Sequence, residues 1–120
     1  MKTYEVDQLK KIFLNYFANN CGHTKIEGSS LVPNVDNSVL FTPAGMYPLI
    51  PYLSGQKNHP SGNKLVNVQN VIRTGAIDRV GEYSFLTFFE LFGAWCIGEY
   101  NKQDVLSNVW NFLTKELKNI

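Results

Sequence analysis

The segment from residue 83 to residue 92 constrains the fold most, because both of its alternating faces are largely apolar. Successive side chains of an extended strand point to opposite faces of a sheet. One face would carry Tyr83, Phe85, Thr87, Phe89 and Leu91, and the other Ser84, Leu86, Phe88, Glu90 and Phe92. A strand that is apolar on both faces is typical of a sheet covered on two sides. We therefore expect this strand in the middle of a layered structure.

Two amphipathic helices are predicted, one near each end of the chain. Residues 5–20 carry apolar side chains at the spacing of one helix face, with Thr3 as N-cap and Gly22 as part of the stop signal. A second apolar stripe runs from Val105 to Leu117. Asn101 would be its N-cap, with Asp104 three residues later, a spacing typical of a capping box. These stripes predict helices that each bury one face.

Short strands complete the expected layout. Residues 24–27 and 38–42 favour strands separated by a turn-rich loop that includes Asp36 and Asn37, and residues 65–72 form a β-rich run ending at Arg73. Prolines limit any helix in residues 46–53 to about one turn, and the polar residues 55–63 favour a mobile loop. The order predicts an α+β fold, an antiparallel sheet flanked by helices, in a single domain over residues 1–120.

Charge and composition exclude several functions. Eleven Lys and Arg against ten Asp and Glu give a net charge of +1, so we do not expect the chain alone to bind a phosphate backbone strongly. No apolar run approaches the ~20 residues that cross a bilayer, and no signal peptide is evident, so we expect a cytoplasmic protein without a membrane partner. Cys21 and Cys96 lack CxxC spacing, which argues against zinc and against a disulfide framework.

Two blocks of sequence carry a resemblance to a known family. Ser29-Ser30-Leu31-Val32-Pro33 leads to Leu40-Phe41-Thr42-Pro43-Ala44-Gly45-Met46, and the second block runs from Phe88 to Tyr100. In order and nearly in spacing, they resemble the first half of the aminoacylation core of alanyl-tRNA synthetases, which are class II synthetases. The resemblance covers roughly residues 8–117. It implies a partial class II core with the first two signature regions, and it places the third region and the alanine-binding residues beyond Ile120.

The resemblance assigns roles to individual residues. Arg73 matches the second signature arginine, which implies a catalytic contact with the ATP α-phosphate and the substrate carboxylate; the alternative is a strand-end arginine in a surface ion pair. Phe89 matches the phenylalanine expected to stack on adenine, with a plain core role as the alternative. Met46 borders the amino-acid pocket of the family, with structural filling as the alternative. ATP is the implied cofactor, and Mg²⁺ would enter only with it.

Three departures from the family bear on function. Residues 74–80 form a shorter loop without the Lys-His-Asn-Asp run, which weakens the case for engaging the tRNA acceptor end, although Asp78 and Arg79 keep polar groups available to ATP. Phe85-Leu86 replaces paired histidines, and Ala94 replaces an asparagine. Polar pocket groups have therefore become apolar. Such changes are expected when a site loses selection for catalysis or takes a different ligand.

Several functions remain open from the sequence. The first is a truncated synthetase relative that retains part of an ATP or aminoacyl-adenylate site and cannot alanylate tRNA alone. The second is one subunit of a split enzyme, completed by a second chain. The third is a non-catalytic interaction module that forms a homodimer through an apolar face. His23 is expected to be structural, and a catalytic Cys21–His23 pair is a minor alternative because sequence neighbours seldom have the required geometry.

Overall fold

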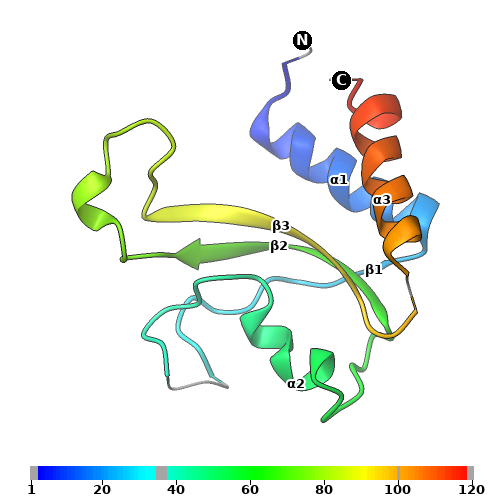
Figure 1. Cartoon of the computed structure of the whole chain (residues 1–120), viewed down its shortest axis with the longest axis horizontal. Helices are drawn as coiled ribbons and strands as arrows, with labels where there is room; N and C mark the ends of the chain where they lie inside the picture. Colours follow the sequence, from blue (N-terminus) through cyan, green and yellow to red (C-terminus); the bar gives the residue numbers. More distant parts are fainter. Residues whose placement is uncertain (1–2, 35–37, 100, 119–120) are drawn as a thin grey trace. The chain divides into compact units, whose positions relative to one another are not determined.

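The computed structural model describes residues 3–34, 38–99 and 101–118 (Figure 1). The chain divides into two compact units. The first unit comprises Met1–Ile26, Asn58–Val66 and Ala94–Ile120, and the second comprises Glu27–Lys57 and Asn67–Gly93. Strands β2 (Lys64–Ile72) and β3 (Phe88–Cys96) contribute residues to both. A single domain over residues 1–120 stays a prediction. Asp36, Asn37 and Tyr100, which the sequence arguments used, lie outside the described residues.

The sheet has the order β1-β2-β3 and is mixed. Strand β1 (Thr24–Lys25) pairs with β2 in parallel, with Thr24 opposite Leu65. The second pair is antiparallel, since Arg73 N–H donates to Thr87 O at one end (2.9 Å) and Ile97 N–H donates to Asn63 O at the other (2.8 Å). The α+β class is therefore confirmed, but the sheet is not antiparallel throughout. Parallel pairing needs a long connection, and the segment between Lys25 and Lys64 provides it.

The core of the first unit is an aromatic cluster between two helical segments. Helix α1 (Val6–Cys21) contributes Phe13, Tyr16 and Phe17, and helix α3 (Lys102–Asn111) continues as a π-helix (Phe112–Glu116) that contributes Phe112. The Phe13 and Phe112 rings meet edge to face with centroids 5.6 Å apart. Tilted or edge-on pairs add to the stabilisation that burial alone gives. The predicted apolar face of the first helix is thus covered within this unit. The predicted burial of the second stripe is largely wrong, because Val105, Leu106, Val109 and Trp110 of α3 are exposed and, of the stripe, only Leu117 is buried.

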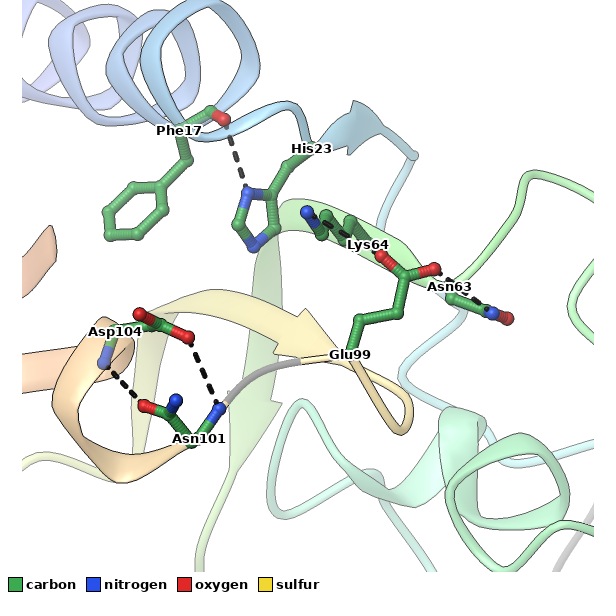
Figure 2. Close-up of polar contacts among 7 residues, drawn as sticks. All are labelled: Phe17, His23, Asn63, Lys64, Glu99, Asn101 and Asp104. Atoms are coloured by element: carbon green, nitrogen blue, oxygen red, sulfur yellow. Dashed lines mark hydrogen bonds and ion pairs between the residues drawn. The ribbon is translucent and has the colours of Figure 1, made fainter.

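The helix ends follow local sequence signals, with one exception. Gly22 closes α1 in the left-handed conformation (φ 72°), as predicted. The capping box of α3 is also confirmed, because Asp104 N–H donates to Asn101 Oδ1 at 2.9 Å and Asn101 N–H donates to Asp104 Oδ2 at 3.4 Å (Figure 2). Thr3 as N-cap is wrong. Glu5 is the last extended residue before α1, so Thr3 lies too far from the first turn to cap it.

Strand β3 corrects the strongest sequence expectation. It begins at Phe88, since Phe85 N–H donates to Glu82 O (3.3 Å) and Ser84 has a φ of 74°, which closes a turn where the alternation predicted a strand. Tyr83 is 97% exposed and Phe88 55% exposed. Burial on both faces is therefore wrong for the described residues. On one face Phe88 and Phe92 are exposed and Glu90 between them is half-buried, while the alternate residues from Phe89 to Trp95 on the opposite face are half-buried or buried.

The segment before β2 is also less regular than predicted. Residues 38–42 form no strand; instead Thr42 bridges two segments, since its N–H donates to Leu31 O and its carbonyl oxygen accepts from Ile72 N–H. The prediction of short helix in residues 46–53 is confirmed by a 3₁₀ turn (Tyr47–Leu49) followed by α2 (Ile50–Leu53). Residues 55–63 contain no helix or strand, and their mobility stays a prediction.

Candidate functional site

A pocket of about 420 Å³ lies in the second unit, beside the turn that connects β2 to β3. Its volume falls in the range of about 300–1,000 Å³ that is usual for small-molecule sites. The pocket contains one cationic side chain, one hydroxyl and several apolar groups. Its lining residues are Arg73, Gly75, Ala76, Ser84, Phe85, Leu86 and Phe89. The structure therefore brings together two residues that the sequence proposed for one site, Arg73 and Phe89.

Arg73 follows the last residue of β2, and three contacts fix its position. Its N–H donates to Thr87 O, its Nε donates to Pro43 O at 2.8 Å, and its guanidinium carbon lies 5.4 Å from the centroid of the Phe89 ring. No carboxylate in the described ranges lies within ion-pair distance of Arg73, so the surface ion pair is not what forms here. The terminal nitrogens of the guanidinium keep N–H donors for an anion.

Phe89 comes from the second position of β3 and is half-buried. It does not belong to the aromatic cluster of the first unit, and part of its ring surface lines the pocket. An aromatic ring beside a guanidinium offers a flat apolar surface next to a positive charge. This combination is chemically suited to a planar base that carries an anionic group.

Asp78 and Met46 do not line the pocket. Asp78 lies in an exposed 3₁₀ turn (Ile77–Arg79) of the connection. Met46 precedes the Tyr47–Leu49 turn and is 47% exposed. The site as the structure gives it therefore rests on Arg73 and Phe89, and the roles of Asp78 and Met46 stay predictions.

Sequence reasoning missed the other walls of the pocket. Ser84, Phe85 and Leu86 line it, whereas the sequence pattern predicts all three in a strand and the family comparison marks Phe85-Leu86 only as a replacement of histidines. The signal that could have found them is the turn chemistry after Arg73, where Gly75 and Gly81 interrupt the strand pattern. A turn folds the chain back over its own start. Residues on its far side then face the residue at the end of β2.

A buried glutamine holds the segment against which Arg73 rests. Gln69 of β2 is 1% exposed; its Nε2 donates to Ser29 O at 2.9 Å, and its Oε1 accepts from Ser29 N–H at 2.8 Å. The next residue, Ser30, accepts from Thr42 Oγ1 at 2.9 Å. Pro43 follows Thr42 in the sequence, and its carbonyl oxygen accepts the hydrogen bond from Arg73 Nε. Gln69 therefore supports the position of Arg73 through two neighbouring segments.

Two titratable side chains of the first unit, His23 and Cys21, have contacts that indicate structural roles. His23 is buried, and its Nδ1–H donates to Phe17 O at 3.2 Å (Figure 2); burial lowers the pKa of its ring. Burial also raises the pKa of the Cys21 thiol, which hydrogen bonds to Tyr16. A thiol held in its neutral form beside a tyrosine is not prepared for attack. The expected structural role of His23 is confirmed, and the contacts do not support a catalytic Cys21–His23 pair.

Neither a metal cluster nor a membrane-spanning helix is present among the described residues. Residues 3–34, 38–99 and 101–118 contain no cluster of three or more His, Cys, Asp or Glu side chains that could hold a metal ion. In the same ranges, no helix combines the length and the apolar character needed to cross a membrane. Absence of zinc and a cytoplasmic location stay predictions.

Comparison with known proteins places the sequence of this chain in a family. Residues 8–119 match the family described as tRNA synthetases class II (A). The chain is 46% identical over 115 residues to alanine–tRNA ligase of Treponema denticola, covering 96% of this chain and 19% of the relative. It is 50% identical over 108 residues to the Treponema pallidum enzyme (90% and 18%), and 38% identical over 110 residues to that of Rubrobacter xylanophilus (92% and 12%).

The chain thus spans about a fifth of the length of the first two of these relatives. The match nonetheless extends over nearly the whole of this chain and includes both strands that border the pocket. The chain belongs to the class II tRNA synthetases, and it is related to the N-terminal part of alanine–tRNA ligase.

Proposed function

We propose that this chain carries part of the ATP and aminoacyl-adenylate site of an alanine-activating class II synthetase, and that the pocket of Arg73 and Phe89 is that part. One observation carries the proposal. Arg73 has no carboxylate partner in the described ranges, and its guanidinium lies beside the Phe89 ring in the wall of a ligand-sized pocket. We expect the chain to act in the cytoplasm.

The side chains of Arg73 and Phe89 suit the chemistry of amino-acid activation. The carboxylate of the amino acid attacks the α-phosphate of ATP and displaces pyrophosphate, so the reaction depends on positioning and on neutralising negative charge. The guanidinium of Arg73 would bind phosphate and carboxylate oxygens with several N–H groups at once. The Phe89 ring would stack on adenine, a contact worth about 1–3 kcal/mol. Together Arg73 would bind the phosphate of an adenylate and Phe89 would contact its adenine.

The charge of the pocket favours an adenylate over ATP. Arg73 is the one charged side chain among the lining residues. A single cation can neutralise one phosphodiester, whereas a triphosphate needs further cations or Mg²⁺. We therefore expect this chain to bind an alanyl-adenylate analogue more tightly than ATP, and Mg²⁺ to matter only when ATP is the ligand. Asp78 and Met46 should contribute little to this binding, because neither lines the pocket.

The rest of the aminoacylation core must come from elsewhere. Since this chain spans about a fifth of its relatives, we propose that the pocket is completed by further segments, on the same polypeptide or on a second chain. The chain by itself would then neither alanylate tRNA nor bind tRNA strongly. Its net charge of +1 agrees with weak binding to a phosphate backbone.

A second candidate function rests on the exposed side of helix α3. Leu106 and Trp110, one helical turn apart, are 69% and 60% exposed. Large apolar side chains grouped in this way mark interaction surfaces. The alternative is therefore a non-catalytic module that forms a homodimer, or that binds the remaining core, through this face.

Thermal denaturation with ligands separates these functions. We would measure the Tm of the chain with ATP, alanine, both together, and a non-hydrolysable alanyl-adenylate analogue. At about 100 times Kd, ligand binding adds about 2.7 kcal/mol, which corresponds to a shift of roughly 10 °C. Arg73→Ala should weaken analogue binding about tenfold to a hundredfold, and Arg73→Lys should restore it only in part, because lysine lacks the planar fork.

The matched control is Lys11→Ala, which removes one positive charge from the exposed side of α1. It should leave the shift unchanged. A shift that Arg73→Ala leaves intact would contradict the proposed site. No shift with any ligand, together with a Tm that rises with protein concentration and falls in Trp110→Ala, would instead support the interaction module.

A further inference from the structure

In the connection between β2 and β3, backbone hydrogen bonds recur at intervals of three residues. Arg79 N–H donates to Ala76 O (3.0 Å), Glu82 N–H donates to Arg79 O (3.1 Å), and Phe85 N–H donates to Glu82 O (3.3 Å). The first and last members of this series, Ala76 and Phe85, line the pocket. The backbone therefore links two pocket walls through Arg79 and Glu82, neither of which lines it.

Side chains reinforce the same series. The guanidinium of Arg79 donates to Glu82 Oε2 from Nε (3.2 Å) and from Nη2 (2.8 Å). Its central carbon also lies 3.8 Å from the centroid of the Phe85 ring. This is a close cation–π contact, well inside the ≈6 Å limit for such pairs. Arg79 thus holds Phe85 from one side while its charge is compensated by Glu82.

We propose that Arg79 is a positioning residue of the adenylate site: it acts through Phe85, whose ring it holds in place as a wall of the Arg73 pocket. The dependence of ligand affinity on Arg79 rests on the proposed function, whereas the placement of Phe85 does not. This assigns Arg79 a role different from direct contact with ATP. Its guanidinium is engaged by Glu82 and Phe85, and it is not among the groups that line the pocket.

The geometry also explains why the pocket needs such a residue. Ser84, which precedes Phe85, has a φ of 74°, a conformation that is unfavourable for a residue with a side chain. A turn that contains a strained residue persists only when surrounding contacts hold it. The ion pair and the cation–π contact of Arg79 supply two such contacts on either side of Ser84.

The first arm of the test needs no ligand. We would record backbone amide NMR spectra of the full chain as wild type, Arg79→Ala, Arg79→Lys and Glu82→Gln. In Arg79→Ala we expect shifts at pocket amides, including Leu86 and Phe89. We expect Arg79→Lys to return them toward wild type, because lysine keeps a cation above the Phe85 ring. Shifts confined to residues 77–82 would overturn the proposal.

The second arm measures Kd for the alanyl-adenylate analogue in a double-mutant cycle of Arg79→Ala and Phe85→Leu. Loss of a partly exposed cation–π contact predicts that Arg79→Ala binds about two- to fivefold more weakly. In the Phe85→Leu background, Arg79→Ala should have no further effect. A loss that is equal in both backgrounds would show that Arg79 does not act through Phe85, and would overturn the proposal. If the wild-type chain binds no ligand, the proposed function fails, and the amide spectra still decide the role of Arg79.

Discussion

Replacing Gln69 by methionine tests whether the segment behind Arg73 depends on one buried amide. Methionine keeps the length and the approximate volume of the side chain but removes its polar atoms. The wild-type amide makes three hydrogen bonds: two with the backbone of Ser29 and one, at 2.8 Å, with Asn70 O. The side chain is 1% exposed, so water cannot readily replace these bonds. The substitution therefore leaves backbone groups near Gln69 without a partner.

The magnitude follows from the bonds lost. Each hydrogen bond contributes about 0.5–1.5 kcal/mol, and an unsatisfied buried group costs about 1–3 kcal/mol. Since the Ser29 groups are only partly buried, we expect Gln69→Met to lower the free energy of unfolding by about 2–4 kcal/mol. This is a large fraction of the roughly 5–15 kcal/mol typical of a domain. With a urea m-value of about 2 kcal/mol/M, the midpoint would fall by roughly 1–2 M.

Urea denaturation followed by circular dichroism measures this change. The control is Asn70→Thr, the next residue of β2, whose side chain is exposed; it should change the free energy of unfolding by less than about 0.5 kcal/mol. Gln69→Glu should be at least as harmful as Gln69→Met, because it loses both donated bonds and buries a charge. If the free energy of unfolding of Gln69→Met lay within about 0.5 kcal/mol of the wild-type value, the hydrogen bonds of Gln69 would not hold the Ser29 segment in place. Our account of how Arg73 is supported would then be wrong.

Two further predictions concern stability. Burial lowers the pKa of His23 below its ordinary value of 6.5, so the unfolded chain binds the proton more readily than the folded chain. The free energy of unfolding should therefore fall as the pH drops through about 6.5. Urea midpoints measured from about pH 7.5 to about pH 5.5 should fall less in His23→Gln than in the wild type. Equal slopes in the two proteins would mean that the proton is taken up elsewhere. Gly28→Ala should cost about 1–3 kcal/mol in the same assay, because a Cβ there would lie 2.8 Å from Val68 O, whereas Gly75→Ala, which meets nothing within 4 Å, should be nearly neutral.

Signals that act within a few residues predicted most of the helix ends, but they did not predict which face of the second helix is buried, since Leu106 and Trp110 of the predicted stripe are exposed. The Asn101–Asp104 capping box and the left-handed Gly22 are formed by neighbours in sequence, so their chemistry can be recognised without knowing the fold. Thr3 failed as an N-cap because α1 begins only at Val6, after Glu5, which makes no side-chain capping hydrogen bond; a residue that favours capping does not by itself fix where a helix begins. The aromatic stripe of α1 was also predictable, although its partner Phe112, contributed from the π-helical continuation of α3, was not.

Strand predictions failed where tertiary contacts decide. Residues 38–42 have the composition of a strand, yet Thr42 bonds to two different segments and forms no ladder. The alternation in residues 83–92 predicted burial on both faces, but Phe88 is exposed in the described chain. An apolar side chain indicates that burial would be favourable, but the sequence alone does not identify the segment that would cover it. For the same reason, the resemblance predicted that Arg73 and Phe89 share a site, while Asp78 and Met46 lie outside that pocket.

The turn that ends the strand pattern early is also what builds the pocket. Phe85 and Leu86 are neighbours in sequence, and in a regular strand they would point to opposite faces. Both nevertheless line the pocket, because the Glu82–Phe85 turn and the left-handed Ser84 redirect the chain before β3 begins. Proteins tend to break local sequence rules at functional sites, where other contacts compensate for the strain. Here Arg79 and Glu82 provide those contacts, so the strand prediction fails at the turn that forms a wall of the proposed site.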